Sequence, residues 1–338
     1  MNRNLIRAGA LLCAVMLLFG GCLRRGEKGK EAGDRPAGMT AEEIMALKNP
    51  EESTLVADGV TYRRRQNVST LLLMGIDKSG SLETAETDKG GQCDVLLLIV
   101  LDRDAGLQTI LQIDRDTMTD VEMLDYRGKS TGLTRTQQIC LSHSYGQGDE
   151  KSCENVVRTV SRLLMDIPVD GYASILYDAI PELNDAVGGI EVTIEDDFSA
   201  ADPSFVMGKT IVLKGKQALT YVRGRQSVAD GTNVNRMKRQ RTFLNRFGDR
   251  VRGLLRMDSS VINDLYAVAE PYMLSDLTLS ELTSFALEGA GYKDGGILTT
   301  SGEHVTVKNP NGTSSTEFYP EEESILQTVL TLFYEPVG

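Results

Sequence analysis

Three short apolar runs limit the fold of this chain more than any other feature. Residues 69–74, 95–101 and 107–113 are nearly all apolar. Because their hydrophobicity is continuous rather than alternating, they are typical of strands that are buried on both faces. Segments with helical spacing alternate with the strands along the chain. This alternation predicts an α/β fold in which α-helices sandwich a mixed β-sheet.

The other elements are predicted from periodicity and from residues that break it. The longest helix should cover residues 235–255, where Met237, Leu244 and Val251 mark a buried stripe. A helix over residues 179–186 should end at the Gly188-Gly189 pair. We further predict strands at 172–176 and 190–194, helices at 153–165, 261–269, 280–288 and 321–333, and one or two short strands within 289–320.

The N-terminus predicts export. Arg3 and Arg7 precede an apolar run over residues 8–19, which is short for a membrane span and typical of a signal-peptide core. Small residues before Cys22 resemble a lipobox, in which Cys22 would carry lipid and begin the mature chain. Arg24 and Arg25 favour the alternative, an uncleaved signal anchor. Either route puts the folded part on the extracytoplasmic face of the cell membrane.

Changes in composition suggest how the 338 residues are organised. Residues 1–22 are the export signal, and residues 23–66 are polar and Gly-rich, which predicts a flexible tether. Residues 67–256 hold the predicted core. Residues 257–338 are interpreted as a C-terminal extension of helices and strands that packs on the core as a scaffold.

The cysteines and histidines exclude some classes of site. Cys140 and Cys153 could form a disulfide in an exported protein, or they could be buried free thiols. There is no Cys-x-x-Cys pair, and the only histidines are His143 and His304. A zinc site or a histidine-based triad is therefore not predicted.

Carboxylates stand at the ends of the apolar runs. Asp77 follows the first run and Asp94 precedes the second, so adjacent strand ends could share a divalent cation, Mg²⁺ or Mn²⁺. The third run stops at the charged segment 114–117. In isolation, each of these groups could equally be a solvated residue in a turn.

A basic patch contrasts with the rest of the chain. The formal net charge is -12, which disfavours general nucleic-acid binding, but residues 223–256 hold ten Lys or Arg and two Asp. Arg236 and Gln240 share a helix face, and Arg223 and Arg225 co-orient if that segment is extended. Arginines that converge beside a cation can hold a pyrophosphate, although an ordinary basic helix face is the alternative.

Together and in this order, the segments resemble the LytR-CpsA-Psr family over roughly residues 71–247. The matching segments are Gly75-Ile76-Asp77, Gln92-Cys93-Asp94, Ile113-Asp114-Arg115-Asp116-Thr117, the runs 138–146, 167–172 and 184–190, and Leu213 to Arg225 followed by Arg236, Arg239 and Gln240. The resemblance implies transfer of a glycopolymer from a polyprenyl-pyrophosphate carrier to peptidoglycan through a phosphodiester bond. It also implies an apolar slot for the prenyl chain.

The resemblance assigns roles to individual residues. Asp77 and Asp94 would bind the metal. Asp116 would either orient Arg115 or assist proton removal. The pyrophosphate would bind to Arg115, Arg223, Arg225, Arg236, Arg239 and Gln240.

Departures from the family pattern keep other functions open. Gln92 stands where the family has an arginine, and Asp114 where it has a proline. Cys93 and Cys140 replace a hydroxyl and an amide. The alternatives to a phosphotransferase are a non-catalytic binder of polyprenyl-pyrophosphate lipids and a pyrophosphate hydrolase on the same fold. A DNA-binding regulator is disfavoured by the export signal and the acidic charge.

Overall fold

A computed structural model describes residues 54–82, 91–146, 148, 150–224, 233–255, 257–258, 260–308 and 314–337. The predicted signal peptide with Cys22, most of the predicted tether, and Arg225 lie outside these ranges. No helix among the described residues is both long enough and apolar enough to cross a membrane.

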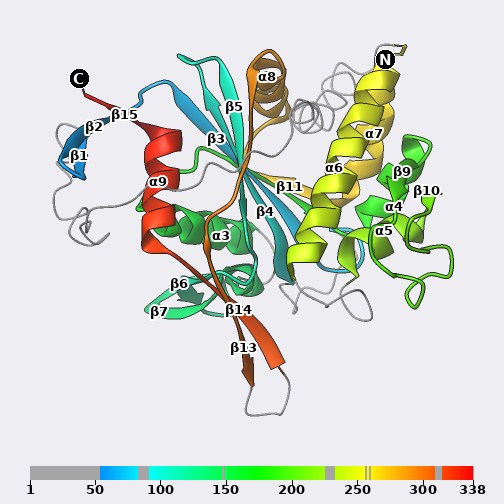
Figure 1. Cartoon of the computed structure of the whole chain (residues 1–338), viewed down its shortest axis with the longest axis horizontal. Coiled ribbons are helices and arrows are strands. Elements are labelled where there is room, and N and C mark those ends of the chain that lie inside the picture. Colours follow the sequence, from blue (N-terminus) through cyan, green and yellow to red (C-terminus); the bar gives the residue numbers. More distant parts are fainter. Residues whose placement is uncertain are drawn as a thin grey trace.

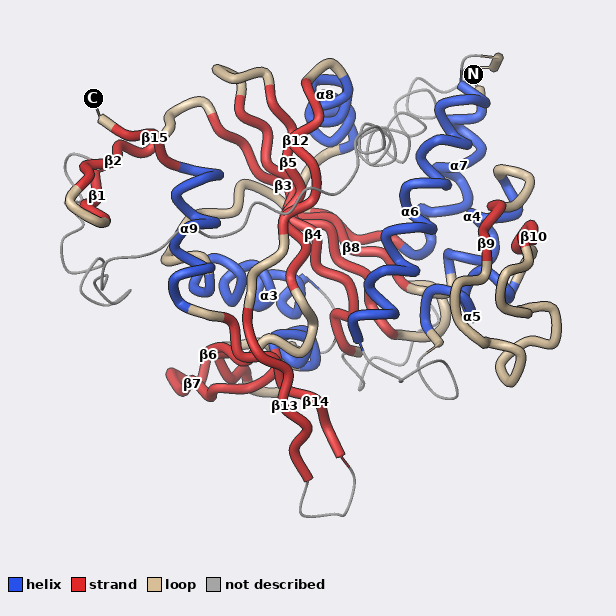
Figure 2. Tube along the Cα trace, viewed as in Figure 1, coloured by secondary structure: helices blue, strands red, loops and turns tan. Residues whose placement is uncertain are grey.

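A six-stranded mixed sheet lies at the centre of the molecule (Figures 1 and 2). Its order is β11-β8-β3-β4-β5-β12, with parallel pairs at β8–β3 and β5–β12 and antiparallel pairs elsewhere. The strands are β3 (Val68–Asp77), β4 (Gln92–Asp102), β5 (Leu107–Ile113), β8 (Tyr172–Leu176), β11 (Met273–Ser275) and β12 (Lys293–Leu298). The predicted mixed sheet is confirmed.

Helices cover both faces of this sheet. Leu72 and Leu98 pack on one face against α3 (Glu150–Leu163) and α9 (Glu322–Phe333). The next residue along each strand points to the other face, where the covering helices are α6 (Asn233–Leu255) and α8 (Leu279–Ala290). Both sets of side chains are therefore apolar, which explains the continuous hydrophobicity of the strands.

A second core lies beside the sheet and includes one face of α6. It is built from α4 (Ala179–Ala186), α5 (Lys216–Arg223), α7 (Val261–Ala269), β9 (Ile190–Thr193) and β10 (Thr210–Leu213). Phe198 and Phe205 pack with their ring centroids 5.2 Å apart, and Tyr221 of α5 contacts both rings. This aromatic cluster holds α5 in place.

The glycine pair after α4 acts as predicted. Gly188 and Gly189 have φ angles of 84° and 89°, and the Gly189 N–H donates to the carbonyl of Asn184. A Cβ at Gly189 would collide with Val212 and with the backbone of Leu213. The left-handed backbone and the close β10 strand both require glycine here.

The predicted tether is wrong at its C-terminal end. β1 (Thr54–Ala57) and β2 (Val60–Arg64) form a hairpin, and β2 also pairs with β15 (Tyr334–Pro336) near the other end of the chain. Leu55 and Ala57 are buried in the core with α9. The two strands are only four and five residues long, and β2 ends in Arg63 and Arg64, so average composition conceals them.

The C-terminal region is not an extension packed on a finished core. It supplies both edge strands of the central sheet, β11 and β12, and a hairpin made of β13 (Gly302–Lys308) and β14 (Ser314–Pro320). The hairpin projects from the body of the molecule (Figure 1). β11 pairs with β8, and β12 pairs with β5. Pairing between strands so distant in sequence leaves no local pattern, so these two pairs could not be predicted from the sequence.

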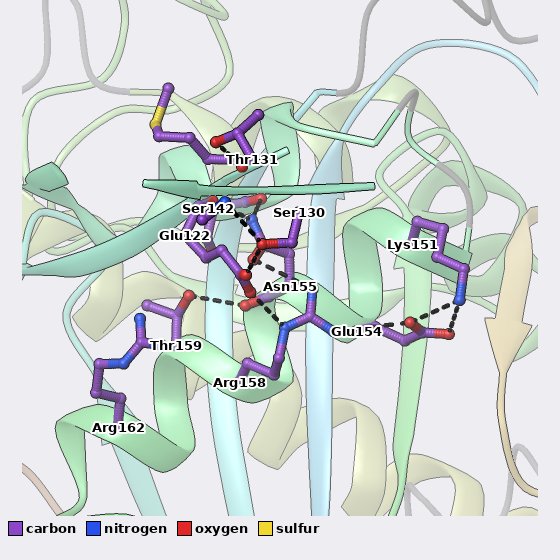
Figure 3. Close-up of polar contacts among 12 residues, drawn as sticks. Glu122, Ser130, Thr131, Ser142, Lys151, Glu154, Asn155, Arg158, Thr159 and Arg162 are labelled. Carbon is purple, nitrogen blue, oxygen red and sulfur yellow. Dashed lines mark hydrogen bonds and ion pairs between the residues drawn. The ribbon is translucent and has the colours of Figure 1, made fainter. Parts of the chain in front are cut away.

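A further hairpin lies between β5 and α3. It consists of β6 (Met118–Leu124) and β7 (Ser130–Gln138), and the short helix η1 (Ile139–Ser144) follows it. Figure 3 shows how α3 holds this segment. Asn155 donates to the carbonyls of Ser142 (2.9 Å) and Glu122 (3.1 Å), and Arg158 pairs with the Glu122 carboxylate at 3.0 Å. These contacts fix the position of η1.

Candidate functional site

Asp94 lies in a β-bulge between β3 and β4. Val95 pairs with Gly75 and Cys93 pairs with Ile76, so Asp94 is the extra residue on β4. A bulge redirects the side chain of its extra residue. The Asp94 residue is only 5% exposed. The bulge places its carboxylate beside the end of β3, where Asp77 follows Ile76.

Two arginines from distant parts of the chain meet at Asp94. Arg115, which follows β5, brings Nη1 to within 2.5 Å of Oδ1. Arg236 of α6 brings Nη1 to within 3.1 Å of Oδ2. All three residues are buried. The central sheet and the long basic helix therefore converge on one carboxylate.

Arg115 is enclosed by protein groups. Its Nη2 donates to Gln92 Oε1 (2.5 Å) and to Cys140 Sγ (3.0 Å), and its Nε lies 3.3 Å from Asp116 Oδ1. Burial lowers the pKa of Arg115, but Cys140, Asp94 and Asp116 raise this pKa by more, so it lies above its ordinary value. Arg115 is a fixed buried cation, and Asp116 helps to orient it.

The predicted disulfide between Cys140 and Cys153 is not formed in the structure. Both cysteines are free and buried. Cys140 contacts Arg115, whereas the Cys153 thiol lies 3.5 Å from Ser174 Oγ. Burial raises the pKa of the Cys140 thiol to about 11, so it is neutral at pH 7. The alternative of buried free thiols describes these residues.

Arg223 forms a second, more open pair with Asp77. Its Nη2 lies 2.6 Å from Asp77 Oδ1, and the two side chains are 45% and 28% exposed. Arg223 is the last residue of α5, so this part of the motif is helical. Arg225, the other arginine of this motif, lies outside the described residues.

Arg239 has contacts other than those predicted for a phosphate ligand. Its Nε donates to the carbonyl of Tyr221 at 3.0 Å, its Nη2 donates to the carbonyl of Gly224, and its guanidinium lies 4.7 Å from the centroid of the Phe198 ring. Burial lowers the pKa of Arg239. These contacts tie the end of α5 to α6 and so hold Arg223 in position.

An apolar cavity of about 160 Å³ adjoins this cluster. The polar side chains in its lining are Ser174, Tyr177 and Gln240. Gln240, predicted as a pyrophosphate ligand, also donates to the carbonyl of Val222 at 3.3 Å. The apolar lining comes mainly from Leu73, Val95, Leu97, Leu183, Phe243 and Phe247. A predicted phosphate ligand therefore borders an apolar space between the sheet, α4 and α6.

The carboxylates suit only one kind of metal binding. In the described part of the chain, no group of three or more His, Cys, Asp or Glu could hold a metal ion. Asp77 and Asp94 supply oxygen donors at neighbouring strand ends. Mg²⁺ is commonly held by one or two carboxylates together with substrate phosphates. The donor set fits a cation that binds together with a phosphate ligand.

Two residues beside the site were missed in the sequence. His304 of β13 brings Nε2 to 2.9 Å from Asp114 Oδ2, and Tyr177 lines the cavity. In addition, the Phe318 N–H of β14 donates to the Asp116 carbonyl at 2.8 Å. His304 is 190 residues away from Asp114, so no local pattern links the two residues. The one signal in the sequence was Asp114 itself, which stands where the family has a proline.

Comparisons with known proteins agree with the fold and the motifs. Residues 37–331 match the LytR_cpsA_psr family. Biofilm regulatory protein A of Streptococcus mutans is 29% identical over 233 residues, which are 67% of this chain and 53% of that protein. The polyisoprenyl-teichoic acid–peptidoglycan teichoic acid transferase TagU of Enterococcus faecalis is 29% identical over 221 residues, 65% of each chain. The match thus spans between about half and two thirds of these relatives.

The crystal structure of TagV from Bacillus subtilis has the same fold. Its TM-score is 0.56 at 23% identity, and the alignment covers 79% of this chain and 96% of TagV. The family match covers most of the chain, including the strand ends and the basic helix of the site. The protein therefore belongs to the LytR-CpsA-Psr family.

Proposed function

We propose that this protein transfers a glycopolymer from a polyprenyl-pyrophosphate carrier to peptidoglycan, on the extracytoplasmic face of the membrane. The observation that carries the proposal is the buried Asp94–Arg115–Arg236 cluster beside an apolar cavity. A polyprenyl pyrophosphate has a matching apolar tail and anionic head. The name of the E. faecalis relative supports the same chemistry. The membrane anchor would be a lipid on Cys22 or an uncleaved signal segment.

The partly exposed Arg223–Asp77 pair is the best candidate for the first contact with the pyrophosphate. Arg223 and Asp77 are partly exposed, and such pairs contribute only about 0–1 kcal/mol. A phosphate can therefore take over the Arg223 guanidinium at low cost. Asp77 and Asp94 would be the carboxylates that hold Mg²⁺, and the bound ion would neutralise part of the phosphate charge.

The buried residues would provide preorganisation. Arg236 would contact the phosphate while it holds Asp94. Arg115 has contacts to four side chains, so its role would be to hold the Asp94 carboxylate in a fixed position. Asp116 is 1% exposed, which favours orientation of Arg115 over proton removal.

Phosphoryl transfer at such a site depends on positioning and charge neutralisation. The wall sugar hydroxyl would attack the sugar-proximal phosphorus and pass its proton to solvent water. The new oxygen–phosphorus bond links polymer and wall. The bond to the polyprenyl phosphate breaks, and this phosphate leaves with the negative charge.

The test measures product and leaving group together. The full chain in detergent is incubated with a polyprenyl-pyrophosphate glycan, peptidoglycan fragments and Mg²⁺, and both products are followed by mass spectrometry. We expect Asp94→Asn and Arg236→Lys to lower the transfer rate at least about 100-fold, because each removes preorganised charge. Arg103→Lys, in the partly exposed pair with Glu288, is the control. Unchanged transfer in both site variants would refute the assignment.

Gln92 favours a second candidate, a carrier-lipid binding protein without transferase activity. Gln92 adds no positive charge to the site where the family has an arginine, and it occupies a donor of Arg115. Binding without either product supports this candidate, and a gain of transfer in Gln92→Arg would locate the cause. Polyprenyl phosphate release without a covalent wall product would instead indicate a hydrolase.

A further inference from the structure

Tyr177 lies at the boundary between the cavity and the charged cluster. It follows β8 directly, and its N–H donates to the carbonyl of Ile76 at 3.0 Å, one residue before Asp77. Its ring packs on Gly75, where an added Cβ would lie 3.0 Å from the ring carbon Cε1. The residue is 3% exposed and lines the cavity. The Gly-x-Asp motif therefore makes room for this aromatic ring.

The hydroxyl of Tyr177 is unusual because it is buried without a partner. In the described part of the chain, it has no hydrogen bond. The other polar side chains in the cavity lining do have partners: Ser174 donates to Leu274, and Gln240 donates to Val222. A buried hydroxyl without a partner destabilises the fold, and phenylalanine would fill the same space without this cost. The hydroxyl is therefore explained better by a ligand than by packing.

The charged neighbours indicate what kind of ligand. Burial raises the pKa of Tyr177 well above its ordinary value, Asp94 raises this pKa further, and Arg236 lowers it. The hydroxyl thus stays protonated and can donate. Asp94 already forms ion pairs with Arg115 and Arg236 and, among the described residues, no hydrogen bond with Tyr177, so the hydroxyl can donate to another anion. An anionic group with an apolar tail would fill both sides of this boundary.

We propose that the Tyr177 hydroxyl donates a hydrogen bond to a phosphate oxygen of a prenyl phosphate whose chain occupies the cavity. The inference rests on the proposed function and assigns the Tyr177 hydroxyl a role in binding the phosphate. Tyr177 is then a binding residue that recognises the junction between the lipid tail and the phosphate.

The test compares two lipids that differ only in the phosphate. Binding of decaprenyl phosphate and of decaprenol to the full chain in detergent micelles is measured for the wild type and three variants. Tyr177→Phe should weaken decaprenyl phosphate binding about 10- to 100-fold, the effect of losing a hydrogen bond to a charged group. It should leave decaprenol binding unchanged and the melting temperature equal or higher. Tyr334→Phe, a tyrosine buried to the same extent in the core with α9, should change neither affinity.

Arg236→Lys distinguishes a failure of the Tyr177 role from a failure of the proposed function. If it weakens decaprenyl phosphate binding and Tyr177→Phe does not, the role of Tyr177 is refuted while the proposed function stands. If Tyr177→Phe weakens both lipids equally, the residue only packs, and the inference is again refuted. If the wild type does not distinguish the two lipids and Arg236→Lys has no effect, the proposed function itself fails.

Discussion

At the scale of single residues, the site depends on a few buried polar groups whose partners are fully specified. Arg115 contacts four side chains from three separate segments of the chain. One of these contacts is to a neutral thiol, that of Cys140. A buried arginine with this many partners stabilises the fold only while every partner keeps its protonation state.

Cys140 should make the protein less stable at alkaline pH. The pKa of its thiol is about 11 in the folded chain and 9.0 as the ordinary value. The folded state therefore holds the proton more tightly, so the contribution is complete below pH 9 and is lost as pH rises towards 11. We expect Cys140→Ser to reduce the fall in unfolding free energy by up to about 1.4 kcal/mol per pH unit in this window. Urea denaturation between pH 8 and pH 10.5 measures the slope.

Cys93 is also buried, and burial raises the pKa of its thiol. The variant Cys93→Ser therefore serves as a comparison for Cys140→Ser. Cys93→Ser should change the same slope without removing an Arg115 contact. Identical slopes for the wild type and Cys140→Ser would contradict a raised pKa at Cys140.

At the scale of elements, the β13–β14 hairpin holds the loop that carries Arg115 and Asp116. His304 pairs with Asp114, and the Phe318 N–H donates to the Asp116 carbonyl. Gln138 at the end of β7 also donates to Asp116 Oδ1 at 3.1 Å and to the carbonyl of Thr316 in β14. Two hairpins therefore meet at this loop.

Removal of the His304 contact should impair transfer more than stability. We expect His304→Ala to lower the transfer rate about tenfold, since the loss of one hydrogen bond to a charged group allows the loop to move. Tyr319→Phe on the same hairpin removes only a contact to Glu317, so it is the matched control. The rates are measured in the mass-spectrometric assay. Equal rates for wild type and His304→Ala would show that the hairpin does not position the loop.

At the scale of the whole molecule, the two ends of the described chain are joined. β2 pairs with both β1 and β15, and Leu55 and Ala57 pack in the core that contains α9. The folded unit therefore includes residues that composition assigned to a tether.

This arrangement predicts the effect of shortening the chain. A chain that starts at residue 67, the predicted boundary, should lose about 2–4 kcal/mol of stability, because it loses β15 pairing and the burial of Leu55. A chain that starts at residue 51 should melt like the full-length protein. The melting temperatures of the two shortened chains are compared by thermal unfolding. Equal melting temperatures would support residue 67 as the start of the folded unit.

Much of the fold follows from local patterns. The predicted bounds of β8, α4 and α7 agree with the structure, and those of α6 differ by two residues at one end. These elements have strong periodicity and clear stop signals. The β6–β7 hairpin and β11 were not predicted, because many of their residues are exposed or partly exposed. β12 lies in the region 289–320, where one or two short strands were predicted without bounds, and its pairing with β5 has no local signal.

The sequence by itself determined the α/β class, the two buried faces of the sheet and the residues that form the charged cluster, because burial and charge are properties of residue type and spacing. Only the tertiary structure decided what each charge does. The bulge at Asp94 joins Arg115 to Arg236, packing turns Arg239 towards α5, and β13 brings His304 to Asp114. Such roles depend on contacts between segments up to 190 residues apart, and no local pattern of residues encodes them.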